Sequence, residues 1–211
     1  MSLINKEKVL NGVGKAVDVT NKAADKASSF VKEKEIDKKA MKAAKTAEKG
    51  IKSINPSCHT SVIPIADGGE GLLDVLITAT KGKYITLSAH GPLMKMAKTH
   101  YGLSGNGRTA IIEMAAISGL PLVPIEQRNP MLTTTFGTGE LIKDALNKGC
   151  RNFIIGIGGS ATNDAGLGML QALGFRFLDK SGHTLGTGGQ IMEAVANIDT
   201  SGIHPLSLIH I

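Results

Sequence analysis

The stretch from residue 152 to residue 173 constrains the fold of this chain more than any other part of its sequence. Residues 152–157 read NFIIGI, an apolar run that is typical of a strand buried on both faces of a parallel sheet. A polar, glycine-rich loop follows at 156–164, and residues 165–173 have the apolar spacing of a helix. A strand, a loop and a helix in this order indicate an α/β domain.

The rest of the chain after residue 55 continues this alternation. Apolar segments predict further strands, the first of them short and buried, at 60–65, 84–88, 99–103, 109–114 and 175–178. Helical spacing of apolar residues predicts helices at 71–80 and 139–147. Glu113 interrupts an apolar strand, so its carboxylate either faces a cleft at the strand end or is paired within the core.

Composition divides the chain near residue 50. Residues 1–50 carry 12 lysines against 7 acidic residues, whereas the remainder carries 12 basic and 11 acidic residues and 23 of the 26 glycines. The first segment is rich in alanine and lysine, with a thin apolar stripe, which predicts a helix that docks weakly. It is either a solvated helix or a basic helix that meets a membrane surface or nucleic acid. Its lack of arginine and of an aromatic belt favours the solvated helix.

Several classes of protein are excluded by what the sequence lacks. No apolar run approaches the roughly 20 residues that cross a bilayer, and the first residues do not have the order of a secretory signal. Cys58 and Cys150 are far apart and the histidines show no ligand spacing, which argues against a disulfide scaffold or a zinc site. We therefore expect a cytoplasmic protein with neither a membrane nor a nucleic-acid partner.

Three polar, glycine-rich loops each stand just before a predicted helix. Loop 1 is DGGEG at 67–71, loop 2 is TTTFGTGE at 133–140, and loop 3 is GIGGSATND at 156–164. Unpaired backbone N–H groups at a helix N-terminus attract anions, and serine and threonine hydroxyls add further donors. Glycine and threonine also serve ordinary turns and caps, but three such loops in one short domain favour a site for phosphate or carboxylate.

Loop 3 also fits the fingerprint of dinucleotide-binding proteins. Gly156-x-Gly158-x-x-Ala161 follows a predicted strand, and Asp179 ends the next strand at a suitable distance. Against this interpretation, residues 162–164 are polar where a Rossmann helix would pack on its sheet, and the other two loops stay unexplained. An NAD(P)-dependent oxidoreductase is therefore one alternative function, and a basic helical interaction protein is another.

Taken together, these segments resemble the bacterial glycerate kinases that phosphorylate D-glycerate with ATP. The matching stretches stand in the family's order with similar gaps: PIADGGEG (64–71), TAIIEMAA (109–116), RNP (128–130), TTTFGTGELI (133–142) and IGIGGSATND (155–164). The resemblance covers about residues 47–203. It implies a two-domain α/β fold with the active site in a cleft between the domains.

The resemblance also implies a reaction and its cofactors. The γ-phosphoryl group of ATP would pass in line to a hydroxyl of D-glycerate, usually giving 2-phosphoglycerate, with Mg²⁺ shielding the phosphates. Asp67 or Glu70 would act as the base or orient the hydroxyl.

The resemblance also implies which residues, in the loops or beside them, would bind the acid, the phosphates and the metal. A guanidinium and three hydroxyls would hold the glycerate carboxylate: Arg128, Thr133, Thr134 and Thr135. Backbone and side-chain donors of loop 3 would cradle phosphate: Gly158, Gly159, Ser160, Thr162 and Asn163. Asp164 would face the metal.

Both ends of the chain depart from the family pattern. Family members open with a strand and an Asp-Ser-Phe-Lys loop where residues 1–46 are lysine-rich, and residues 205–211 do not look like the family's continuation. We therefore expect an incomplete kinase domain at 47–204, preceded by a basic helical segment and followed by a short unrelated tail. Because one wall of the cleft is missing, such a chain is expected to be a weak or inactive enzyme on its own.

Overall fold

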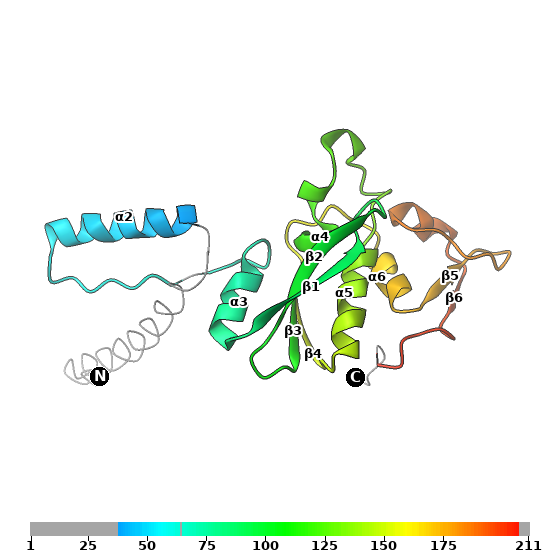
Figure 1. Ribbon diagram of the computed structural model, residues 1–211. Helices are drawn as coiled ribbons and strands as arrows, with labels where there is room; N and C mark the ends of the chain where they lie inside the picture. The colour runs from blue at the N-terminus through cyan, green and yellow to red at the C-terminus, as the bar shows by residue number, and fades with distance from the viewer. Residues whose placement is uncertain (1–37, 64, 207–211) are drawn as a thin grey trace, which may run out of the picture. The chain divides into compact units, whose positions relative to one another are not determined.

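The computed structural model describes residues 38–63 and 65–206 (Figure 1). Its contacts divide the chain into two compact units, Met1–Ile65 and Ala66–Ile211. The part of the predicted basic helix at residues 1–37 lies outside the described residues. No helix among the described residues is both long enough and apolar enough to cross a membrane.

The first unit contains helix α2 (Lys38–Ile54), whose described residues are helical as the alanine and lysine pattern predicts. A Glu48–Lys52 ion pair of 2.7 Å, four residues apart, supports the helix on its surface. The buried strand predicted at 60–65 is wrong: residues 60–63 and 65, the described part of this segment, form no strand, and Ile63 and Ile65 are exposed. A strand needs a neighbour to pair its backbone, and the described residues provide none for this segment.

The second unit is built on a four-stranded mixed sheet. Its strands are β1 (Lys83–His90), β2 (Met96–Leu103), β3 (Thr109–Glu113) and β4 (Asn152–Gly156), in the order β1-β2-β3-β4. The first three are antiparallel neighbours, whereas β3 and β4 are parallel. The predicted α/β architecture is confirmed, including the parallel strand that leads into loop 3.

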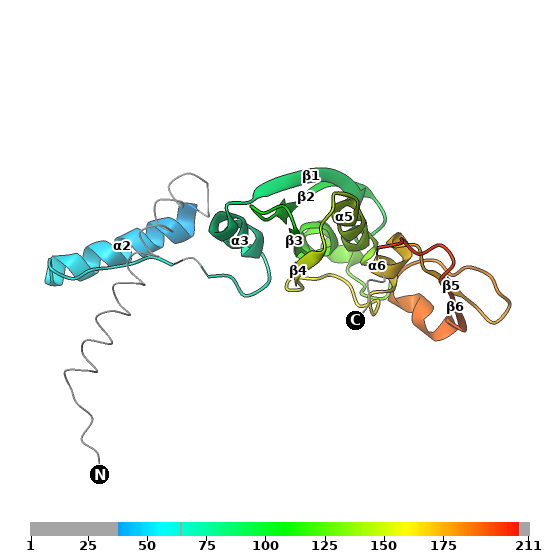
Figure 2. The same ribbon diagram turned by 90° about the horizontal axis from the view of Figure 1, so that it is seen from below.

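Helices cover both faces of this sheet. Successive side chains of β3 point to opposite faces of the sheet. Ala110 and Ile112 belong to the apolar cluster on one face, and Ile111 belongs to the cluster on the other. Helix α5 (Phe136–Asn147), with the short α4 (Ala115–Ser118), packs on the first face, and Figure 2 shows β1 and β2 curving over α5. Helix α3 (Leu72–Thr80) covers the second face with Leu73 and Ile77.

Strand β4 lies at the edge of the sheet, and the expectation that it is buried on both faces is wrong. Ile154 and Ile155 are 42% and 37% exposed, and no described strand pairs with its outer side. The apolar run that resembled a central strand therefore belongs to an edge strand that leaves apolar side chains accessible.

The remaining elements form a smaller group beside the main sheet (Figure 1). Helix α6 (Leu167–Ala172) packs on α5, and β5 (Arg176–Leu178) pairs antiparallel with β6 (Asn197–Asp199) in a sheet of their own. Short 3₁₀ turns complete the unit: η1 (Leu120–Leu122), η2 (Ile125–Gln127) and η3 (Gly189–Ala194).

The position of β5 argues against the dinucleotide interpretation of loop 3. A Rossmann unit needs the next strand parallel and adjacent to the first, but β5 is not part of the sheet that contains β4. Asp179 instead accepts hydrogen bonds from the amides of His183 and Ser181 at 2.9 and 2.8 Å. These amides, that of His183 foremost, hold the pKa of Asp179 below its ordinary value. This carboxylate therefore stabilises its own turn.

Candidate functional site

Loops 1 and 3 meet directly through glycine backbone. The Gly158 amide donates to the Gly68 carbonyl at 3.0 Å. A Cβ on Gly158 would lie 2.8 Å from the Cα of Gly69, and one on Gly156 would lie 2.4 Å from the Gly68 oxygen. No side chain fits at these two positions, so the glycines that suggested ligand binding also allow the loops to touch.

Glu113 fixes the helix that follows loop 1. Its side chain is 8% exposed, and its Oε1 accepts the Leu73 amide in the first turn of α3 at 2.7 Å. An acidic group at this end of a helix satisfies an otherwise unpaired N–H and complements the helix dipole. Of the two interpretations of Glu113, the structure supports the carboxylate paired within the core.

Loops 2 and 3 are joined by the buried carboxylate of Asp164. This residue is 1% exposed, and it accepts the Thr135 amide at 2.8 Å and the Gly168 amide at 3.2 Å. The hydroxyls of Thr134 and Thr135 and the Gly166 amide also donate to it, at 3.0 to 3.2 Å. One carboxylate thus serves the starts of α5 and α6 together, where helix dipoles favour a negative charge.

The third threonine of loop 2 is also used within the protein. Thr133 is fully buried, and its hydroxyl donates to the Ala161 carbonyl at 2.7 Å. On the other side of loop 3, the Ala161 amide donates to the Ser118 carbonyl at 2.9 Å. Ala161 thus ties loop 3 to loop 2 and to the end of α4. Since loop 1 also contacts loop 3, loop 3 lies next to both other loops.

Both residues predicted as the base lie at the surface on loop 1. The Oδ1 atom of Asp67 accepts the Gly69 amide at 3.0 Å, which orients the carboxylate, and the side chain is exposed. Glu70 is also exposed. The predicted phosphate-binding residues Gly159 and Asn163 are exposed on loop 3.

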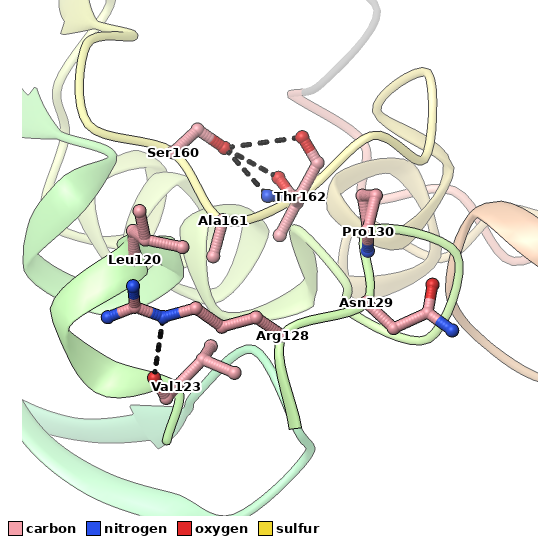
Figure 3. Close-up of a pocket in the computed structure, with 8 residues that line it drawn as sticks. All are labelled: Leu120, Val123, Arg128, Asn129, Pro130, Ser160, Ala161 and Thr162. Atoms are coloured by element: carbon pink, nitrogen blue, oxygen red, sulfur yellow. Dashed lines mark hydrogen bonds between the residues drawn. The ribbon is translucent and has the colours of Figure 1, made fainter. Parts of the chain in front are cut away.

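A hollow of about 230 Å³ lies between loop 3 and the segment that carries Arg128 (Figure 3). We call it the Arg128 hollow, and eight residues line it: Leu120, Val123, Arg128, Asn129, Pro130, Ser160, Ala161 and Thr162. The Arg128 Nε donates to the Val123 carbonyl at 3.2 Å, which fixes the plane of the guanidinium. Figure 3 shows the side chain passing below Ala161 toward Leu120. The hollow brings together residues that the sequence had assigned to two ligands, the acid and the phosphates.

No group of three or more histidine, cysteine or acidic side chains that could hold a metal occurs in the part of the chain that the structure describes. Mg²⁺ requires fewer protein ligands, because one or two carboxylates and substrate phosphates usually suffice. The exposed Asp67 fits such a role, since within the described part of the chain a hydrogen-bond partner is recorded for its Oδ1 alone. Asp164, the predicted metal ligand, has both oxygens occupied by protein donors.

Sequence reasoning missed a fourth glycine-rich segment near the site. Residues 186–189 read GTGG, and the Gln190 amide donates to the Met131 carbonyl at 2.9 Å. A Cβ on Gly189 would lie 2.5 Å from the Asn163 oxygen and 3.3 Å from that of Pro130. The segment therefore supports loop 3 and the Arg128 segment from behind. Its signal was a cluster of glycines before a helical turn, the same pattern that marked the other three loops.

Comparison with known proteins gives consistent results. The sequence pattern of the Glycerate kinase family matches residues 37–209. The glycerate kinase of Bacillus subtilis is 52% identical over 164 residues, and the glycerate 2-kinase of Escherichia coli K12 is 49% identical over 166. These alignments cover 78% and 79% of this chain but only 43% and 44% of the relatives.

A solved structure agrees with these relatives. The crystal structure of a candidate glycerate kinase 2 from Salmonella typhimurium LT2 has a TM-score of 0.65 at 49% identity, and it covers 74% of this chain and 42% of that one. The chain thus spans less than half the length of the relatives it matches.

Proposed function

Because this chain belongs to the glycerate kinase family, we propose that it forms part of an enzyme that transfers the γ-phosphoryl group of ATP to a hydroxyl of D-glycerate. A kinase family implies the use of ATP, and we expect the reaction to take place in the cytoplasm. The observation that carries the proposal is the convergence of loops 1 and 2 on loop 3, beside a hollow that contains an arginine.

This arrangement suits phosphoryl transfer because that reaction depends chiefly on positioning and electrostatic stabilisation. Amides of loop 3 can donate to phosphate oxygens, and those of Gly159 and Asn163 are our candidates for this contact, since the Gly158 amide already donates to the Gly68 carbonyl. The direct contact of loop 1 with loop 3 sets Asp67 beside them.

We assign Asp67 as the base and Glu70 as its nearest alternative. The Gly69 amide fixes one oxygen of Asp67 and leaves the other open to accept a proton. As the glycerate oxygen bonds to phosphorus, its proton passes to Asp67 and the bond from phosphorus to the departing ADP oxygen breaks. Bound Mg²⁺ would shield the phosphate charge, and the carboxylate of loop 1 that does not act as the base, Glu70 where Asp67 is the base, would hold it.

The buried residues of the site have a positioning role in this proposal. The hydroxyls of Thr133, Thr134 and Thr135 donate to protein acceptors, and Asp164 accepts from both helix starts. These groups hold loops 2 and 3 at a fixed separation. They act on the reaction through the loops, without contact to the acid or to the metal.

A transplant tests the proposal on the residues of this chain. Residues 66–203 would replace the aligned segment of the Bacillus subtilis glycerate kinase, and ADP release with D-glycerate would be followed by a coupled assay. We expect kcat/KM within about tenfold of the parent, and Asp67→Asn in the transplant to lower kcat by about 10²–10⁴-fold. Asp179→Asn, whose carboxylate stabilises its own turn, is the matched control and should leave kcat unchanged.

Two results would contradict the assignment. A folded transplant without activity would contradict the function, and a near-normal kcat in Asp67→Asn would contradict the role of that residue. The same assay on the 211-residue chain alone tests the expectation of weak turnover.

A further inference from the structure

Resting on the proposed function, we propose that residues 118–123 hold loop 3 and Arg128 in a fixed relation, and that a hydrogen bond between Ser118 and Thr138 anchors them to α5. We call residues 118–123 the connecting segment. Ser118 and Thr138 are positioning residues in this proposal, because they act on the transfer step through the connecting segment and contact neither substrate. Neither was assigned a ligand from the sequence.

The anchor is a pair of buried hydroxyls. Ser118 is the last residue of α4 and Thr138 lies in the first turn of α5, and the two residues are 0% and 1% exposed. Ser118 Oγ and Thr138 Oγ1 lie 2.8 Å apart, the usual distance for a hydrogen bond between two hydroxyls. Because both are removed from water, deleting one hydroxyl deprives the other of a bond that solvent does not replace. The pair therefore favours one arrangement of α4 against α5.

The connecting segment pairs with loop 3 directly after the anchor. The Ser118 carbonyl accepts the Ala161 amide at 2.9 Å, and the Leu120 amide donates to the Gly159 carbonyl at 2.9 Å. The two bonds make one rung of antiparallel pairing between the connecting segment and loop 3. This rung lies at the residue whose amide is our candidate for phosphate, Gly159, so the position of that amide depends on the connecting segment.

The other end of the connecting segment holds Arg128. The Val123 amide donates to the Leu120 carbonyl at 3.1 Å, and the Val123 carbonyl accepts the Arg128 Nε at 3.2 Å. Figure 3 shows Val123 on one side of the Arg128 side chain and Ala161 of loop 3 on the other. A continuous series of hydrogen bonds thus runs from Thr138 through the connecting segment to loop 3 and to the guanidinium.

This connection matters for a reaction between two bound substrates. Loop 3 is our candidate for the phosphates of ATP, and the sequence predicts that Arg128 holds the acid, so the connecting segment sets the placement of one reactant relative to the other. Misplacement by about 1 Å can lower a rate by about 10²-fold while both substrates still bind. Weakening the anchor should therefore lower kcat and leave the KM of either substrate nearly unchanged.

The transplant described above tests the anchor by kinetics. Thr138→Val removes the hydroxyl and keeps the volume, and it should lower kcat by about 5- to 50-fold with the KM for ATP and for D-glycerate within about threefold of the parent. Thr138→Ser keeps the hydroxyl and loses a buried methyl group, so it should lower Tm but keep kcat within about twofold. A purely structural role would lower Tm in both variants and leave kcat of the folded enzyme unchanged in both.

Two further variants complete the kinetic test. Ser118→Ala removes the other hydroxyl and should lower kcat by a factor similar to that of Thr138→Val, and the double variant should lower it little further, because the two residues form one interaction. Tyr101→Phe is the matched control. It removes a buried hydroxyl that donates to Asp144 of the same helix α5 at 2.9 Å, away from the connecting segment, and should leave kcat unchanged.

Hydrogen exchange on the 211-residue chain tests the connection without any turnover. In Thr138→Val, the amides of Leu120, Val123 and Ala161 should exchange at least about tenfold faster than in the parent, followed by ¹H–¹⁵N NMR, because local opening of the connecting segment becomes easier. The Leu73 amide, which Glu113 accepts on the other face of the sheet, should exchange at the parent's rate and shows that the protein is folded.

The outcomes separate this inference from the proposed function. Parent-like exchange of the three amides in both folded Thr138→Val and folded Ser118→Ala would overturn the anchor. A kcat in Thr138→Val equal to that in Thr138→Ser would overturn the positioning role, and turnover in that transplant would still support the kinase function. Faster exchange of the three amides together with a folded but inactive transplant would support the connection and contradict the kinase function.

Discussion

At the residue scale, Asp164 shows how burial can give the carboxylate of a polar loop a structural role that the local sequence does not reveal. An aspartate after Thr-Asn in a glycine-rich loop has the composition of a metal or phosphate site. What distinguishes it is burial, which the local sequence does not show. Its carboxylate accepts hydrogen bonds from the Thr135 amide, 29 residues earlier in the chain, and from the Gly168 amide, 4 residues later.

Replacing Asp164 by alanine should destabilise the second unit by about 3–5 kcal/mol, because several buried donors would lose their acceptor at once. For a unit of this size the fall in Tm would be about 10 °C or more, measured by differential scanning calorimetry. Asp179→Ala is the matched control, since its carboxylate is more exposed and bonds only within its own turn. A Tm for Asp164→Ala equal to that of the control would show that the clamp between loops 2 and 3 is not important for stability.

At the element scale, strand β4 shows which property of a strand its own sequence does not reveal. Its apolar pattern correctly indicated a strand with a parallel neighbour, which the structure identifies as β3. Whether such a strand is central or at an edge depends on how many strands lie beyond it, which is not encoded in the strand itself. The segment at 60–65 failed for the related reason that β-branched residues favour a strand only where a pairing partner is present.

The exposed edge of β4 should promote self-association, because unpaired backbone groups with apolar side chains can pair with another chain. Ile154→Lys should reduce concentration-dependent association, followed by static light scattering and size-exclusion chromatography, while changing Tm by no more than a few degrees. Ile198→Lys is the control, since Ile198 is 57% exposed on the separate β5–β6 sheet. Equal solubility gains in both variants would mean that added charge alone is responsible.

The same comparison explains what could be predicted of the helices and of the site. Helix α3 was placed within one residue because its apolar spacing is clear, whereas α5 begins at Phe136, three residues before the predicted start. Two glycines in its first turn are typical of a loop, so the sequence placed the start of the helix too late. One of them is explained by packing, because a Cβ on Gly139 would lie only 2.3 Å from the carbonyl oxygen of Met169 in α6. Contact with α6 therefore requires glycine there, and that contact is visible only in three dimensions. For the same reason the sequence could predict the loops, but it could not predict that loop 3 and the segment around Arg128 line one hollow.

At the scale of the whole molecule, the two units differ in what holds them together. Both apolar clusters of the structure are made of residues from the second unit, between Leu73 and Leu206. In the first unit, Ile51 and Ile54 of α2 are 46% and 89% exposed. Apolar burial is the dominant stabilising contribution in a small domain, so the second unit contains what it needs to fold without residues 1–65.

A chain of residues 66–211 should therefore unfold cooperatively with a Tm within about 3 °C of that of the full chain, measured by calorimetry. A chain of residues 83–211 is the informative contrast, because it also lacks α3. It would expose the second face of the sheet, remove Leu73 and Ile77 from their cluster, and leave the buried carboxylate of Glu113 without the amide that it accepts. We expect the shorter chain to lose its cooperative transition or to melt at least about 10 °C lower. If 66–211 behaved like 83–211, residues 1–65 would have to contribute stability that the two apolar clusters do not explain.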